Sequence, residues 1–120
     1  MEGSEKIDER RQFKRVSLKE PVQYRFKDSN DFGGCLSTDI SEEGIRINVS
    51  NFIPVNTEVT LSVQLTHEKV VECRGRVMWV EQLPHAERYQ AGLKFESTDS
   101  LFDAKQEIHK FLDSYLRNKL

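Results

Sequence analysis

Apolar and polar residues alternate along most of this chain, which is the pattern of β-strands that bury one face and expose the other. The alternation is strictest at residues 59–65, where every second residue is valine or leucine. Short polar stretches, most of which contain glycine, proline or asparagine, separate the alternating runs and are typical of turns. Six strands are predicted in this way, over residues 22–26, 35–40, 45–49, 59–65, 70–81 and 89–95.

Side chains of the second predicted strand divide between an apolar and a polar face. Leu36, Thr38 and Ile40 share one face, so Asp39 leaves the strand on the other. In the long strand 70–81, the apolar face is made of Val71, Cys73, Gly75, Val77 and Trp79. A glycine on such a face indicates a sharp bend or a close backbone approach, which a small barrel needs where it closes.

After the last predicted strand, the apolar period changes from that of a strand to that of a helix. The apolar residues at helical spacing are Leu101, Ala104, Ile108, Phe111, Leu112, Tyr115 and Leu116. Ser100 with Asp103 resembles a capping box, and Arg117 lies where the helix dipole favours a cation. We predict one amphipathic helix over about residues 100–118, packed by its apolar stripe on a mouth or side of the sheet.

Strands that follow one another without intervening helices form antiparallel sheets, and a small sheet usually closes so that its edges are covered. The chain is therefore predicted to be mostly β, as a six-stranded antiparallel β-barrel with a C-terminal α-helix. Its 120 residues suit one domain. We expect a flexible N-terminal tail over residues 1–9 and a single domain over residues 10–120, with the barrel at about 16–96.

Composition and charge exclude several classes of protein. The net charge of −2 argues against a surface built for general DNA binding. The chain starts without the apolar run of a signal peptide, and no stretch is apolar enough to span a bilayer. Cys35 and Cys73 match no metal motif, and we interpret them as reduced thiols, with a disulfide between strands as the less favoured alternative. These features predict a cytoplasmic protein that does not insert into membranes.

Basic residues are concentrated in the first quarter of the chain, above all in residues 10–15 (RRQFKR). Arginine has a planar fork of N–H donors that fits phosphate oxygens two at a time and can also reach the O6 and N7 acceptors of guanine. A mobile arm of this kind suits a phosphorylated ligand that carries a base. A solvated basic tail is the alternative, and the tract alone leaves both interpretations open.

A second polar stretch, residues 39–44 (DISEEG), connects the second and third predicted strands. The Asp39 carboxylate can accept N–H donors from a base such as guanine, and the Ser41 hydroxyl can bond to a ligand as donor or acceptor. We expect Gly44 to allow a positive φ where the turn enters the next strand. The alternative is a self-contained turn in which Asp39 and Ser41 bond only to nearby backbone N–H groups.

Together these stretches resemble the signature of the PilZ domain family, whose members are bacterial receptors for cyclic di-GMP. Residues 11–15 fit R-x-x-x-R and residues 39–44 fit D/N-x-S-x-x-G, in the same order and on a barrel-like strand pattern. The segments GRV at 75–77 and GLKF at 92–95 also resemble later strands of the family, so the resemblance extends over about residues 8–116. It implies ligand roles for Arg11, Arg15, Asp39, Ser41 and Gly44.

The implied ligand agrees with the chemistry of these side chains. Cyclic di-GMP carries two phosphates for the arginines and two guanines, whose N1–H donor adenine lacks, so Asp39 is expected to select guanine. The resemblance further suggests that an arginine at position 10, Arg10, favours two stacked cyclic di-GMP molecules per domain. It implies no other cofactor and no metal. We expect binding to order the arginine arm and to present a changed surface to an unidentified effector protein, with the chain itself a monomer or weak dimer.

Other candidate residues are less informative. Trp79 is a secondary candidate, as a stacking platform for a base, although an aromatic residue on an alternating strand more often belongs to the core. An enzyme is not predicted, because His67, His85 and His109 are scattered without metal-ligand spacing and no serine or cysteine has an evident base nearby.

Two other functions remain open from the sequence. A small β-barrel could bind RNA or single-stranded DNA through the basic arm, but such barrels usually need exposed aromatic platforms. Here most aromatic residues fall on the inward face or on the helix stripe, so nucleic acid is the less favoured partner. A ligand-independent adaptor of the same fold is the other alternative, and the intact signature residues count against it.

Overall fold

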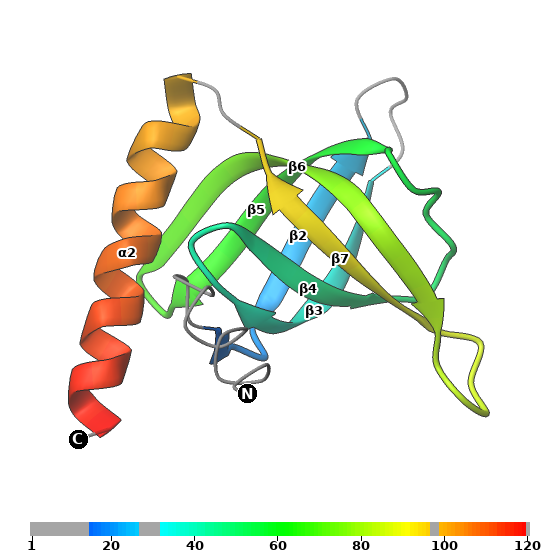
Figure 1. The fold of residues 1–120 in the computed structure, drawn as a ribbon, viewed down its shortest axis with the longest axis horizontal. Helices are drawn as coiled ribbons and strands as arrows, with labels where there is room; N and C mark the ends of the chain where they lie inside the picture. Colours follow the sequence, from blue (N-terminus) through cyan, green and yellow to red (C-terminus); the bar gives the residue numbers. More distant parts are fainter. Residues whose placement is uncertain (1–14, 27–31, 97–98, 120) are drawn as a thin grey trace, which may run out of the picture.

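The strands close into a barrel with one helix beside it (Figure 1). The computed structural model describes residues 15–26, 32–96 and 99–119. The expected tail 1–9 and the candidate residues Arg10 and Arg11 lie outside the described residues. The elements are β1 (Val16–Ser17), β2 (Pro21–Phe26), β3 (Phe32–Ile40), β4 (Gly44–Val49), β5 (Glu58–Thr66), β6 (Lys69–Gln82), β7 (Tyr89–Phe95) and α2 (Asp99–Lys119).

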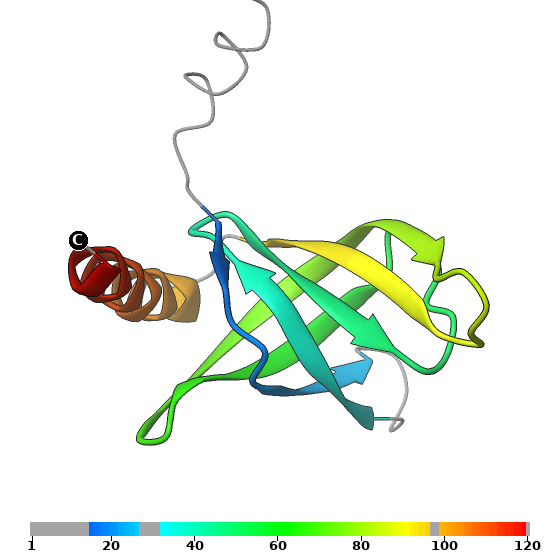
Figure 2. The ribbon, with the colours of Figure 1, turned by 90° about the horizontal axis from the view of Figure 1, so that it is seen from below.

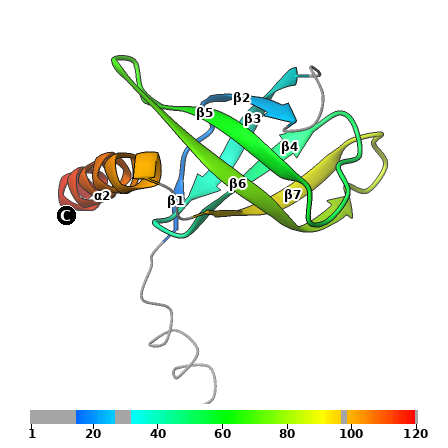
Figure 3. The ribbon, with the colours of Figure 1, turned by 90° about the horizontal axis from the view of Figure 1, so that it is seen from above.

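The sheet order β3-β2-β5-β6-β7-β4 returns to β3 through β3–β4 pairing, and each described strand pair is antiparallel. The predicted six-stranded antiparallel barrel with a C-terminal helix is therefore confirmed. The two-residue β1 was not predicted, because two residues are too few to show an alternation. It pairs with the end of β3, where Ser17 lies opposite Asp39, at the barrel end that faces α2 (Figure 2, Figure 3).

Alternate strand positions fill the barrel interior. One row of paired residues, each at most 3% exposed, crosses four strands and consists of Val16, Ile40, Ile45 and Leu93. Successive residues of a strand point to opposite faces of the sheet. The neighbouring row, which contains Asp39, Arg46 and Gly92, therefore lies on the outer face of the barrel.

Helix α2 packs against β6 through one apolar stripe. Ala104, Ile108 and Leu112 follow one another at intervals of four residues and are at most 6% exposed. The Nζ of Lys69 on β6 lies 3.4 Å from Oε1 of Glu107 and adds a polar contact. The predicted packing by the apolar stripe is confirmed for Ala104, Ile108 and Leu112. The side chains of Ser100 and Asp103, the predicted capping box, lie outside the described part of the chain. No helix in the described part of the chain is long and apolar enough to cross a membrane.

Strand β3 differs from its prediction in length and in the direction of its side chains. It starts three residues earlier than expected, so residues 33–34 lie within the strand. A bulge between Ser37 and Asp39 interrupts the alternation. Leu36 is consequently 51% exposed while Ile40 is buried, so the predicted common face of these two residues is wrong.

Gly75 lies where the barrel wall is tightly packed. A Cβ atom at this position would be 3.0 Å from Leu61 Cδ1 and 3.3 Å from Leu93 Cδ2. The atoms nearest to this position belong to leucine side chains, so glycine is favoured here by tight side-chain packing and not by the predicted close approach of backbone.

We predict that Gly75→Val lowers the free energy of unfolding by roughly 1–3 kcal/mol, because the added methyl groups overpack the contact with Leu61 and Leu93. The matched control is Gly34→Val, since a Cβ at Gly34 meets no atom within 4 Å. The control should change the stability by less than about 0.5 kcal/mol. Urea unfolding of the two variants measures the difference, and equal stabilities would contradict the packing account.

Candidate functional site

Asp39 is a nearly buried carboxylate that lies between two arginines on the outer face of the barrel. The Nε of Arg15 donates to Asp39 Oδ1 at 2.6 Å. The Nε of Arg46 donates to the same oxygen at 3.0 Å, and its Nη2 lies 2.8 Å from Asp39 Oδ2. Two guanidinium groups bring roughly ten N–H donors to about four acceptor positions on one carboxylate. This arginine–carboxylate cluster of Arg15, Asp39 and Arg46 therefore carries excess positive charge and excess donors, which suit an anion.

Arg46 was not among the predicted site residues, although the sequence contains a signal for it. The hairpin of β3 and β4 pairs Ile40 with Ile45 and, one step further out, Asp39 with Arg46. Counting back from the predicted turn at residues 41–44 gives the same pairs. A polar residue directly opposite Asp39 in an antiparallel pair has its side chain on the same face, so hairpin geometry identifies the second arginine.

Ser41 shapes the turn that follows β3. Its buried Oγ accepts the backbone N–H groups of Glu43 and Gly44 at 3.2 and 3.3 Å, and Arg15 Nη1 lies 3.4 Å away. Ser41 therefore bonds to nearby backbone N–H groups, as the alternative of a self-contained turn predicts. Asp39 does not follow that alternative, because its carboxylate is bonded to arginine side chains. A direct ligand role for Ser41 stays a prediction.

Gly44 is required by a close contact and not by its backbone conformation. The predicted positive φ is wrong, since no described glycine has one. A Cβ on Gly44 would instead overlap the carbonyl oxygen of Leu93 on β7. The backbone N–H of Phe95 also donates to the carbonyl of Glu43 at 2.8 Å. The turn is thus pressed against β7 and held there.

Trp79 lies on the outer surface and is 38% exposed. The expectation that it belongs to the apolar face with Val77 is wrong, because a β-bulge between these two residues turns Trp79 outward. Its indole packs over Gly92, where a Cβ would overlap the indole Nε1. The surface of the barrel therefore carries a partly exposed aromatic ring.

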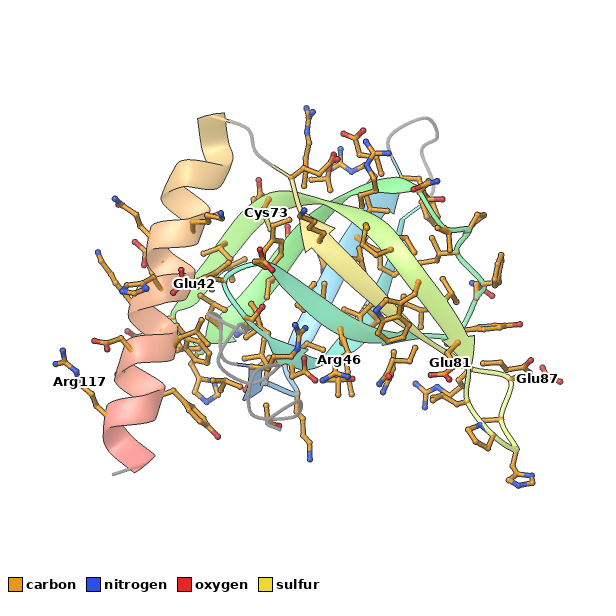
Figure 4. The ribbon with its side chains drawn as sticks, viewed as in Figure 1. Glu42, Arg46, Cys73, Glu81, Glu87 and Arg117 are labelled. Atoms are coloured by element: carbon orange, nitrogen blue, oxygen red, sulfur yellow. The ribbon has the colours of Figure 1, made fainter. Side chains whose placement is uncertain are left out.

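The backbone register connects Trp79 with the arginine–carboxylate cluster. Trp79 lies opposite Gly92, which lies opposite Arg46, which in turn lies opposite Asp39. Four neighbouring strands at about 4.8 Å spacing place the ends of this row about 14 Å apart. Figure 4 shows Arg46 near the middle of the barrel, away from α2. An aromatic ring, two guanidinium groups and a carboxylate thus lie along one surface.

The two cysteines offer no reactive thiolate to this surface. Burial raises the pKa of the Cys35 thiol and of the Cys73 thiol to about 12, so both stay protonated near neutral pH. Among the residues that the structure describes, no group of histidine, cysteine, aspartate and glutamate side chains could hold a metal ion. The arginine–carboxylate cluster offers charge pairing and hydrogen bonding, and Trp79 offers an aromatic face for stacking.

We predict that Gly92→Ala displaces the indole of Trp79 with little loss of stability, because the added methyl group meets the movable end of a partly exposed side chain. Trp79 is the single tryptophan, so its fluorescence reports the change directly. The emission should shift to longer wavelength and become more accessible to a soluble quencher. Gly34→Ala is the control, and an emission spectrum unchanged by Gly92→Ala would show that the indole does not rest on Gly92.

The fold is found in several solved structures. One is the inhibitor of motility MotI/DgrA of Bacillus subtilis, with a TM-score of 0.72, 18% identity, and 92% of this chain and 53% of that chain covered. YcgR of Escherichia coli in complex with c-di-GMP has a TM-score of 0.74, 12% identity, and coverages of 92% and 47%. The K. pneumonia MrkH–c-di-GMP complex has a TM-score of 0.70, 19% identity, and coverages of 91% and 54%. The chain spans about half the length of each of these proteins.

No curated protein matches the sequence significantly. The family model that describes the PilZ domain, in contrast, matches residues 9–114, which is most of the chain. Both signature stretches fall within this range, and the closed barrel agrees with the solved structures. On this match, the chain belongs to the PilZ domain family.

Proposed function

We propose that this domain is a receptor for cyclic di-GMP that signals to a partner protein. The observation that carries the proposal is the arginine–carboxylate cluster at the two signature motifs, with Asp39 bonded to Arg15 and Arg46. The similar structures of YcgR and MrkH are complexes with c-di-GMP, which supports the same ligand class here. Ligand binding without catalysis fits a surface that offers donors, an acceptor and an aromatic ring.

Each part of the ligand has a matching group in the cluster. The phosphates suit the guanidinium forks of Arg15 and Arg46, which can bond to two oxygens at once. The carboxylate of Asp39 suits the N1–H and N2–H₂ donors of guanine. Trp79 lies in the same row and suits stacking with a base. Gly92 between them lets the indole lie close to the barrel wall.

Binding in this mode requires an exchange of partners at Asp39. Arginine donors occupy both carboxylate oxygens before the ligand arrives. When guanine donors take over the Oδ1 position, the guanidinium of Arg15 is released toward a phosphate. Because Arg15 directly precedes β1, its movement changes the path of the N-terminal segment.

The arm residues are brought in by the same movement. Arg11 is four residues before Arg15, so covalent geometry keeps their Cα atoms within about 14 Å of each other. We therefore extend the ligand set to Arg11, and to Arg10 as the residue that favours a second stacked ligand molecule. Ordering of this arm is the change that an effector protein would detect.

We base the proposed location and oligomeric state of the domain on its membership of the PilZ family. We place the domain in the cytoplasm, as a monomer or weak dimer that does not insert into membranes and is not an enzyme.

We predict that Arg15→Ala, Arg46→Ala and Asp39→Ala each weaken cyclic di-GMP binding by at least about ten-fold, since hydrogen bonds to charged groups contribute roughly 1.5–3 kcal/mol. Arg11→Ala should have a similar effect. Isothermal titration calorimetry at low ionic strength gives the affinity and the number of ligands. Arg117→Ala is the control, because Arg117 is an exposed arginine of α2 that pairs with Asp113 at 3.1 Å (Figure 4).

Three outcomes of this experiment would contradict the proposal. Unchanged affinity in the Arg15, Arg46 and Asp39 variants would remove the cluster from the site. Equal affinity for cyclic di-AMP would remove the role of Asp39 in selecting guanine. Strong binding of single-stranded nucleic acid in a gel shift, together with no binding of the cyclic dinucleotide, would favour the nucleic-acid alternative.

We also predict that Trp79→Ala weakens cyclic di-GMP binding by about five-fold to a hundred-fold, since base stacking on an aromatic side chain contributes roughly 1–3 kcal/mol. Trp79→Phe should retain most of the affinity, and ligand should quench the tryptophan fluorescence of the wild type. Met78→Ala is the matched control, because Met78 is the adjacent exposed residue of β6. A wild-type affinity in Trp79→Ala would show that the indole does not contact the ligand.

A further inference from the structure

One side chain of the signature turn reaches the C-terminal helix. Glu42 lies between Ser41 and Gly44 in sequence, and its Oε2 is 2.7 Å from Nδ1 of His109 on α2. Figure 4 shows Glu42 at the inner side of α2, on the edge of the barrel. The Glu42 side chain is 31% exposed and that of His109 is 65% exposed. The pair joins the proposed ligand site to an element 67 residues away along the chain.

Both partners of this pair are held in place by their own elements. The backbone N–H of Ser41 donates to the carbonyl of Gly44 at 2.9 Å, and the Glu43 carbonyl accepts from β7, so the turn is closed at its base. On the helix, Ile108 is fully buried and fixes the position of the next residue, His109. The side chain of Glu42, at the tip of the turn, is therefore directed by its contact with His109.

We propose that His109 is a positioning residue of the ligand site, whose protonated imidazole holds the Glu42 side chain and compensates its charge beside the turn of Ser41, so that affinity for the ligand falls when His109 loses its proton. The proposal rests on the proposed function, since it concerns binding of cyclic di-GMP at the same cluster. It assigns to α2 a part in ligand affinity although the helix contributes no residue to the cluster.

The physical effect is electrostatic. A protonated His109 compensates the charge of the Glu42 carboxylate through a contact of 2.7 Å. A neutral His109 leaves that carboxylate as an uncompensated negative charge one residue from Ser41, in the turn beside the proposed site of a doubly anionic ligand. Weaker binding at higher pH follows from the repulsion between Glu42 and the ligand phosphates.

The charged groups around His109 support this direction of the pH dependence. Glu42 faces it from the turn, and Asp113 lies one helical turn further along α2. From β6, Lys69 pairs with Glu107, and Lys110 of the helix lies 3.9 Å from the same carboxylate. The hydrogen bond to Glu42 raises the pKa of His109 above its ordinary value of 6.5, with a further contribution from the charges of Glu42 and Asp113.

The direction of the pH dependence follows from this raised pKa. A group whose pKa is raised by a partner contributes fully below its unperturbed pKa, and the contribution is lost as the pH rises through the raised value. The charge attraction between His109 and Glu42 is therefore complete below the ordinary pKa of histidine and is lost as the pH rises through the raised pKa of His109. Because coupling between two sites is reciprocal, the ligand must raise the pKa of His109 further.

The first experiment is calorimetric titration of the full chain with cyclic di-GMP at about pH 6 and about pH 8.5, on either side of the histidine pKa. We expect the wild-type Kd to increase by about two- to five-fold at the higher pH, the range typical of exposed ion pairs. His109→Gln, a neutral donor, should show no such change. His109→Lys, which stays charged, should keep the tighter affinity at both pH values.

The control for these variants is His85→Asn. His85 lies in the loop between β6 and β7, at the barrel end opposite α2 (Figure 1). Its φ of 60° is tolerated by asparagine, so the substitution removes an exposed histidine without backbone strain. This variant should retain the pH dependence of the wild type.

The second experiment follows the ring protons of His109 by NMR as the pH is changed. The pKa of His109 should rise when cyclic di-GMP is added and should fall toward 6.5 in Glu42→Gln. A ligand that leaves this pKa unchanged, or a pH dependence that persists in His109→Gln, overturns the role of His109 while the receptor function stands. Absence of cyclic di-GMP binding by the wild type at both pH values overturns the proposed function, and this proposal with it.

Discussion

The interaction on which the site depends is the sharing of the Asp39 carboxylate by two guanidinium groups. A charge this well buried is costly unless partners satisfy it, and the partners must come from outside its own strand. Arg46 comes from the neighbouring strand of the hairpin, and Arg15 comes from the segment that enters β1. The carboxylate thus binds Arg15, the first described residue of the chain, to the wall of the barrel. Any ligand that competes for Asp39 weakens this contact.

Barrel closure determines what else can lie beside this carboxylate. The pairing of β4 with β7 brings backbone so close that Gly44 cannot carry a side chain, and the next glycine across, Gly92, provides the space that the indole of Trp79 occupies. The interior row beneath is filled by branched aliphatic side chains. The candidate ligand surface therefore lies on the outer wall of the barrel, across strands β3, β4, β7 and β6.

The sequence predicted the structural features that depend on the local pattern of apolar and polar residues. It missed the features that depend on how distant strands pair. Period-two alternation located the six barrel strands, because a closed sheet must bury one face of each strand. The bulges in β3 and β6 are set by the register of neighbouring strands, and each reverses the faces beyond it. That is why Leu36 and Trp79 were assigned to the wrong face. Arg46 belongs to no motif, and the need for glycine at position 44 comes from Leu93, distant in sequence.

The turn 41–44 is the point at which three otherwise separate elements meet. Arg15 Nη1 approaches Ser41 Oγ from the N-terminal side, the Glu43 carbonyl is bonded to β7, and Glu42 is paired with α2. The start of β1 and the helix lie at the same end of the barrel (Figure 2, Figure 3). A ligand that moves Arg15 away from Ser41 therefore disturbs the turn 41–44, which also contacts β7 and the helix at this end of the barrel. The β6–β7 loop, in contrast, lies at the opposite end of the barrel, away from these contacts (Figure 1).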